Sequence, residues 1–126
     1  MRHTLLPALL AVFPLAVSPL AAPAWADPAE IVEVAAQERG GTWTVSVTLR
    51  HGDTGWDDYA DGWRIVTESG TVLGTRTLHH PHVEEQPFTR SLSGVDLPQI
   101  EPLFIESSTS VTGWGGVRAP LSLPPS

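Results

Sequence analysis

The segment Trp43-Thr44-Val45-Ser46-Val47-Thr48-Leu49-Arg50 decides the fold, because its side chains alternate between apolar and polar throughout. Successive side chains on an extended strand point to opposite faces, so a period of two predicts a β-strand with one buried face. Such half-buried strands are typical of antiparallel sheets, in which one face packs on the core and the other meets water. We therefore expect an antiparallel, all-β architecture.

Six further stretches carry strand patterns with turn signals between them. They cover residues 31–36, 63–67, 71–78, 88–92, 103–107 and 119–123. No segment has the apolar spacing of an amphipathic helix. Seven short strands predict a seven-stranded antiparallel sandwich that resembles immunoglobulin and fibronectin type III domains, with a small β-barrel as the alternative.

The chain contains no cysteine, so no disulfide can bridge the two predicted sheets. Trp43 and Trp63 are expected to fill the core in its place. The absence of cysteine also excludes thiolate nucleophiles, iron–sulfur clusters and thiolate-bound metals.

The amino terminus has the pattern of a secretory signal peptide. A basic start at Arg2 precedes an apolar run over residues 5–22, and the small-x-small sequence Ala24-Trp25-Ala26 follows. Pro7, Pro14 and Pro19 interrupt this run and Pro23 follows it, which argues against a membrane-spanning helix. We expect cleavage after Ala26 and a periplasmic or secreted mature protein, a single domain of residues 27–126 without a membrane span.

The charge of the chain restricts its partners. It has 14 acidic and 7 basic residues, no lysine, and a formal net charge of −7. An acidic surface repels phosphate backbones, so nucleic acid is excluded as a partner. A cation, a neutral small molecule or a periplasmic protein with a basic patch fits this charge better.

The order of the predicted strands places the histidines. In a seven-stranded sandwich successive loops alternate between the two ends, so residues 51–62, 79–87 and 112–116 are expected at one end. These loops contain four of the five histidines and many of the carboxylates. Immunoglobulin variable domains bind their ligands with loops of one end, which makes this end the expected site.

A metal site is one hypothesis for this end. His80 and His82 have a His-x-His spacing, and His51 with Glu85 could complete a site for copper or zinc. In addition, Gly74, His80, His82 and Glu85 occur in the same order as in a cupin motif. A small metalloenzyme that uses these histidines with Glu85 is therefore an alternative function. A structural domain with no bound metal is the other alternative.

Binding of a partner protein is the second hypothesis. The aromatic, acidic and imidazole side chains expected at this end for such a surface are Trp56, Asp57, Tyr59, His79, Glu84 and Trp114. No Gly-x-Ser-x-Gly nucleophile motif occurs, and no catalytic residue is assigned, so the sequence favours a binding module over an enzyme. Arg90 shares a strand face with core residues, and we expect it to pair with Glu85 or Glu106.

The run Leu-His-His-Pro-His-Val-Glu-Glu-Gln-Pro-Phe-Thr-Arg-Ser-Leu at residues 78–92 resembles a signature of small, uncharacterised exported bacterial β-sandwich proteins. The stretch from Asp53 to Trp63 is similar to the same group. This resemblance implies export and no particular activity.

Overall fold

The computed structural model describes residues 27–125. The seven strands are β1 (Glu30–Arg39), β2 (Thr42–Arg50), β3 (Ala60–Thr67), β4 (Val72–Thr77), β5 (Phe88–Val95), β6 (Leu103–Thr109) and β7 (Gly113–Leu121). The expected signal peptide and its cleavage site, in residues 1–26, lie outside the described residues.

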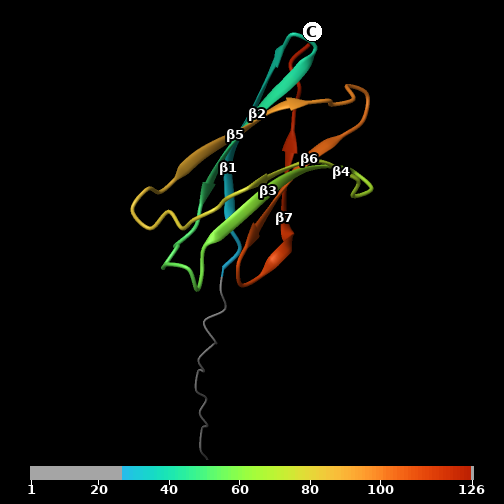
Figure 1. Cartoon of the computed structure of the whole chain (residues 1–126). Coiled ribbons are helices and arrows are strands. Elements are labelled where there is room, and N and C mark those ends of the chain that lie inside the picture. Colours follow the sequence, from blue (N-terminus) through green and yellow to red (C-terminus); the bar gives the residue numbers. More distant parts are fainter. Residues whose placement is uncertain (1–26, 126) are drawn as a thin grey trace, which may run out of the picture.

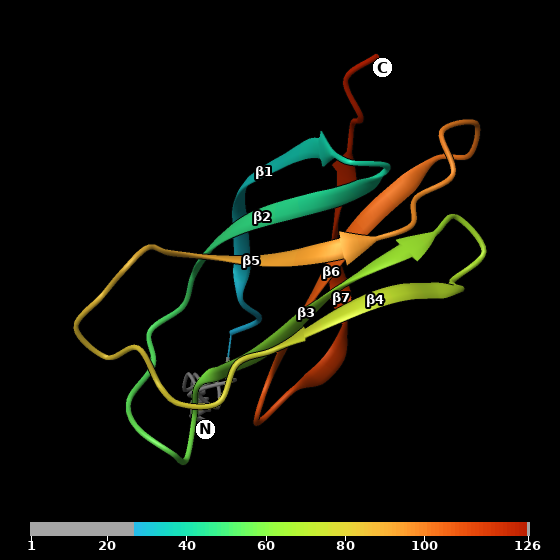
Figure 2. The ribbon, with the colours of Figure 1, turned by 45° about the horizontal axis from the view of Figure 1, so that its top comes forward.

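The strands form two antiparallel sheets that pack face to face (Figures 1 and 2). One sheet has the order β1-β2-β5 and the other the order β4-β3-β6-β7. The chain crosses between the sheets after β2, after β4 and after β5. This arrangement confirms the prediction of an all-β, immunoglobulin/fibronectin type III-like sandwich. It excludes the small barrel, because the two sheets do not join into one closed sheet.

The core lies between the sheets and follows the alternation of β2. Trp43, Val45, Val47 and Leu49 are buried, while the intervening Thr and Ser side chains form hydrogen bonds across to β5 on the outer face. Trp63 of β3 is fully buried in the same core. Both tryptophans that were expected to fill the core are therefore buried in it.

The expected turn at residues 113–116 is wrong, because these residues belong to β7. The chain reverses instead at residues 110–112, where the side-chain hydroxyl of Thr109 accepts hydrogen bonds from the backbone N–H groups of Val111 and Thr112. Gly113 follows in a positive-φ conformation, and Trp114 already pairs with Ser108 of β6. The turn therefore forms where the Thr109 hydroxyl can accept these hydrogen bonds, and not at the glycines.

The expected start of the third strand at Trp63 is three residues late, because β3 begins at Ala60. Gly62 lies within the strand, where a Cβ atom would stand 3.3 Å from the Trp114 ring. The glycine therefore makes room for the indole of β7 and does not end the strand.

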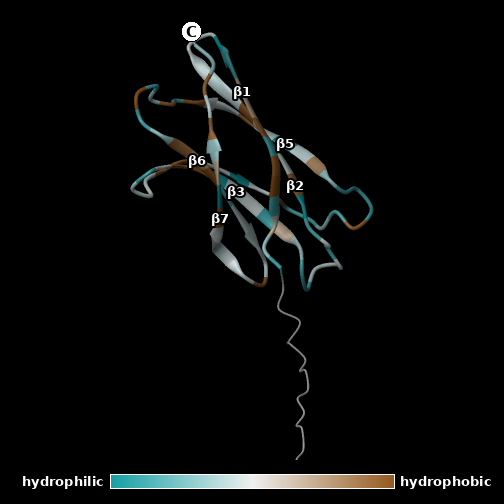
Figure 3. Ribbon diagram, turned by 180° about the vertical axis from the view of Figure 1, so that it is seen from behind, coloured by the Kyte–Doolittle hydropathy of each residue, from teal (hydrophilic) through white to brown (hydrophobic). Residues whose placement is uncertain are grey.

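The loops after β2, β4 and β6 lie at one end of the sandwich, and the turns after β1 and β3 and the β5–β6 connection lie at the other (Figures 1 and 2). Hydrophobic residues are concentrated in the strands, while the loops after β2, β4 and β6 are mainly hydrophilic (Figure 3). Over residues 27–125, no helix is long and apolar enough to cross a membrane.

Candidate functional site

Three loops meet at one end of the sandwich, which we call the loop pole: residues 51–59, 78–87 and 110–112. The backbone N–H of His51 donates to Gln86 Oε1 at 2.9 Å, which joins the first loop to the second. The backbone N–H of Ser110 donates to the carbonyl of Tyr59 at 2.8 Å, which joins the third loop to the first. The prediction that these loops share one end is therefore confirmed.

Asp53 lies at the centre of the loop pole, and its side chain is completely buried. Oδ1 accepts hydrogen bonds from His51 Nδ1 at 2.6 Å and from the backbone N–H of Ala60 at 3.0 Å. Oδ2 accepts from the backbone N–H of His82 at 2.8 Å. Hydrogen bonds to a carboxylate are strong in a buried setting, so Asp53 fixes the two long loops against each other and against β3.

His51 is buried beside Asp53, and both of its ring nitrogens face oxygen atoms. Nδ1 contacts Asp53, and Nε2 lies 3.0 Å from the carbonyl oxygen of Asp27 and 3.6 Å from Asp58 Oδ1. A ring held in this way fastens the first described residue to the loop pole. It does not offer a nitrogen to a ligand from outside.

His82 is buried as well, but its ring nitrogens are not engaged. The ring stacks on Phe88 with 3.9 Å between centroids and 11° between planes. Both nitrogens are buried without a hydrogen-bond partner in the protein. Burial lowers the pKa of His82, and electrostatic interactions with Arg90 and His80 lower it further. The ring is therefore neutral at pH 7.

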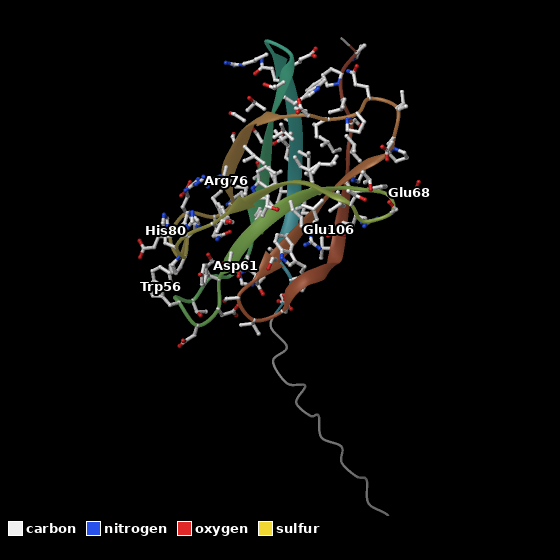
Figure 4. The ribbon with its side chains drawn as sticks, turned by 45° about the vertical axis from the view of Figure 1, so that its right-hand side comes forward. Trp56, Asp61, Glu68, Arg76, His80 and Glu106 are labelled. Atoms are coloured by element: carbon white, nitrogen blue, oxygen red, sulfur yellow. The ribbon has the colours of Figure 1, made fainter. Side chains whose placement is uncertain are left out.

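Glu85 pairs with Arg90 in a two-pronged ion pair of 3.0 and 3.3 Å. The hydrogen bond from Arg90 lowers the pKa of Glu85. Of the two partners expected for Arg90, Glu85 is correct and Glu106 is not. Glu106, labelled in Figure 4, binds Arg64 and Arg118 instead.

The four predicted metal donors do not converge. His80 and His82 lie side by side, with ring centroids 4.8 Å apart, while His51 turns to Asp53 and Glu85 turns to Arg90. Within residues 27–125, no group of three or more His, Asp or Glu side chains is placed to hold a metal ion. The spacing of the sequence brings the two histidines of His-x-His together but not the rest of the set.

The predicted binding residues of the first loop stand at its surface. Trp56 is 66% exposed and packs edge-to-face on Tyr59, with 5.5 Å between ring centroids. Asp57 beside them is exposed. Figure 4 shows Trp56 and His80 at the same end of the molecule, far from Glu68 at the other end.

The other three predicted binding residues are more scattered. His79 and Glu84 are exposed in the second loop. Trp114 is a correction, because it lies in β7 and not in a loop. Its ring lies under the guanidinium of Arg64 at 4.2 Å and against Gly62, so it covers the outer face of the four-stranded sheet.

Asp53 lies in the loop predicted over residues 51–62, but no role was predicted for it from the sequence. A signal for it exists, since Leu49, His51 and Asp53 continue the inward period of β2 beyond the end of the strand, and all three are buried. Gln86 carries no such signal. Its amide joins His51 and His82 by backbone contacts that only the folded chain brings together.

The chain is similar to a protein of Halomicrobium mukohataei described as "Putative lipoprotein", with 39% identity over 90 residues. The match covers 70% of this chain and 44% of that protein, so the chain spans less than half the length of this relative. No protein-family model matches the chain, and no solved structure matches it.

Proposed function

We propose that this protein is an exported, envelope-associated binding domain that contacts a partner protein through the loop pole. The observation that carries the proposal is the exposed pair of Trp56 and Tyr59 on a loop that buried Asp53 fixes from beneath. Exposed aromatic side chains on a rigid support are typical of the residues that dominate binding energy in protein interfaces.

The rigidity of the loop favours binding over a purely structural role. A flexible loop loses conformational entropy when a partner orders it, which weakens the complex. Here the hydrogen bonds of Asp53, together with the Thr54–Asp58 backbone contact of 2.9 Å, hold the loop before any partner arrives. The loop that carries Trp56 is therefore ordered in the free protein, and little conformational entropy is lost when a partner binds.

The charges around Trp56 indicate the kind of partner. Asp57 and Glu84 are exposed at the loop pole, and the whole chain has a net charge of −7. Complementary charge increases the rate and the specificity of association. The partner that fits is a protein with a basic patch beside an apolar pocket for the indole.

Two observations support export. Residues 1–26 have the composition of a signal peptide, and the Halomicrobium relative is described as a lipoprotein. The mature protein is expected in the envelope or periplasmic fraction with Asp27 as its first residue. Intact-mass measurement of the protein from each fraction tests this, and full-length chain confined to the cytosol would contradict it.

The partner proposal is tested with Trp56→Ala. The mature protein is used to capture binding proteins from an envelope extract, and each captured protein is then purified and titrated against the variants. Binding to wild type that weakens at least tenfold in Trp56→Ala, and weakens with rising salt, supports the proposal. Ile100→Ala is the matched control, because Ile100 is 94% exposed at the opposite end. Equal binding by Trp56→Ala and wild type would refute it.

A copper or zinc function through His80 and His82 has weaker support. Two arginines, Arg76 and Arg90, line the same small pocket as these histidines, and positive side chains repel a metal cation. Metal analysis of the dialysed protein separates the two proposals. Stoichiometric copper or zinc that His80→Ala removes would favour the metal function and with it the metalloenzyme alternative.

A further inference from the structure

A small pocket opens between β4 and β5, where the two sheets meet without hydrogen bonding. Its volume is about 100 Å³, and it is lined by Arg76, Leu78, His79, His80, His82 and Arg90. Arg76 and His80 lie on the same side of the molecule in Figure 4. Five of the six lining residues are arginine or histidine, although the chain as a whole is acidic.

The two arginines reach this pocket because both lie on inward-facing positions. Arg76 pairs with buried Trp63 in the β3–β4 ladder, so the two side chains share the inner face of the sheet. Arg90 stands between Phe88 and Leu92 on the inner face of β5. Arginine is rarely placed in a sandwich interior unless a negative group balances it.

The protein supplies only part of that balance. Glu85 binds Arg90 at 3.0 Å, but no carboxylate in residues 27–125 lies within 4.0 Å of the Arg76 guanidinium. Arg76 Nη1 donates to the carbonyl of Thr77, while its Nε is buried without a partner. Both ring nitrogens of His82, whose side chain is 4% exposed, are also without partners. Buried donors left unpaired cost free energy, so the pocket favours a ligand that brings acceptor atoms.

We propose that this pocket binds an oxyanion, the carboxylate, phosphate or sulfate group of a small ligand, between Arg76, His82 and Arg90. Its volume equals that of about three water molecules in the liquid, which suits one such group and not a drug-sized molecule. The planar guanidinium matches two oxygen atoms of an oxyanion at once. The proposal needs neither Trp56 nor a partner protein, so it stands independently of the proposed function.

The test uses sulfate and acetate as probes at pH 7, with chloride adjusted to keep the ionic strength constant. Sulfate presents a tetrahedral group and acetate a planar one, and neither changes its protonation near neutral pH. Binding is followed by NMR of the histidine ring protons. We expect saturable shifts for His80 and His82 with at least one probe, and no shift for His51, whose nitrogens are already occupied.

Arg76→Met is expected to weaken this binding about tenfold or more, because a charged donor is lost. Arg39→Met is the matched control, since it removes the same charge beside the turn at Gly40, at the opposite end of the sandwich, and should leave binding unchanged. His82→Phe is a second variant that retains an aromatic ring against Phe88 and should also weaken binding. The absence of saturable shifts in wild type, or equal weakening in Arg39→Met and Arg76→Met, would overturn the proposal.

Discussion

Asp53 is an acidic side chain without access to water, and three N–H groups from three parts of the chain depend on it. Replacing it with asparagine keeps the shape but removes the charge and turns an NH₂ group toward one of these donors. We expect Asp53→Asn to lose about 2–4 kcal/mol of stability, because buried donors are left without acceptors. Urea unfolding measures this loss.

Asp57→Asn is the control for this experiment, since Asp57 is exposed in the same loop. Its stability should stay within about 0.5 kcal/mol of wild type. A loss below about 1 kcal/mol for Asp53→Asn would show that the network around Asp53 does not hold the loops.

His82 makes the stability of the fold depend on pH. Burial lowers the pKa of His82 below the value of 6.5 for a free side chain. As the pH falls, His82 therefore binds a proton in the unfolded chain before it does so in the folded chain. When the unfolded state binds more protons, stability falls as the pH falls. Arg90 and His80 lower the pKa of His82 in the same direction as burial, whereas Glu85 and Asp53 raise it, and the net effect is a lowered pKa.

We therefore expect wild type to lose more stability between pH 7 and pH 5 than His82→Phe does. Urea midpoints at several pH values measure the difference, which removes the contribution of the other histidines. Parallel curves for the two proteins would show that His82 titrates alike in the folded and unfolded states.

At the scale of elements, β2 was predictable because one local rule decides it. Every second side chain from Trp43 to Leu49 is apolar, and each one is buried. The start of β7 was not predictable in this way. The glycines around Trp114 indicate a turn by local preference, but pairing with Ser108 of β6 and packing on Gly62 extend the strand through them. Contacts between distant segments override the local signal there.

β4 and β5 approach closely at Gly74, where a Cβ atom would stand 3.0 Å from Leu92 Cδ2 and 3.5 Å from Val95. A valine at this position has to displace the Leu92 side chain from its place in the core. We expect Gly74→Val to lose about 1–3 kcal/mol, as overpacked cores do, measured by thermal or urea unfolding.

Gly52→Val is the matched control for Gly74→Val, because nothing lies within 4 Å of a Cβ atom built at Gly52. Its loss should stay below about 1 kcal/mol. Similar losses for both variants would mean that backbone freedom, and not packing between the sheets, explains the glycine at position 74.

At the scale of the whole molecule, the alternation of loops between two ends was enough to gather His51, Trp56 and His82 at one pole. The directions of the side chains were not predictable, because they depend on partners from other elements. His51 turns to Asp53, two residues away, and Glu85 turns to Arg90 on β5. The order of the histidines and carboxylates in the sequence therefore predicted that they lie at the loop pole, but not which groups their side chains contact.

The two sheets share one core, and no disulfide divides or reinforces it. We expect a single cooperative unfolding transition in which tryptophan fluorescence and far-ultraviolet circular dichroism coincide. A reducing agent should leave the midpoint unchanged, because the chain has no cysteine. Two separated transitions would show that the sheets unfold independently.

Asp27 touches His51 at the loop pole, whereas Pro124 and Pro125 lie beside the β1–β2 turn at the opposite end (Figure 1). A fusion protein or sensor surface joined at Asp27 would crowd Trp56 and the oxyanion pocket. The same attachment at the carboxyl end would leave both open to solution. Affinity measured on a biosensor should therefore depend on which terminus is immobilised, with the carboxyl-terminal linkage giving the full binding capacity.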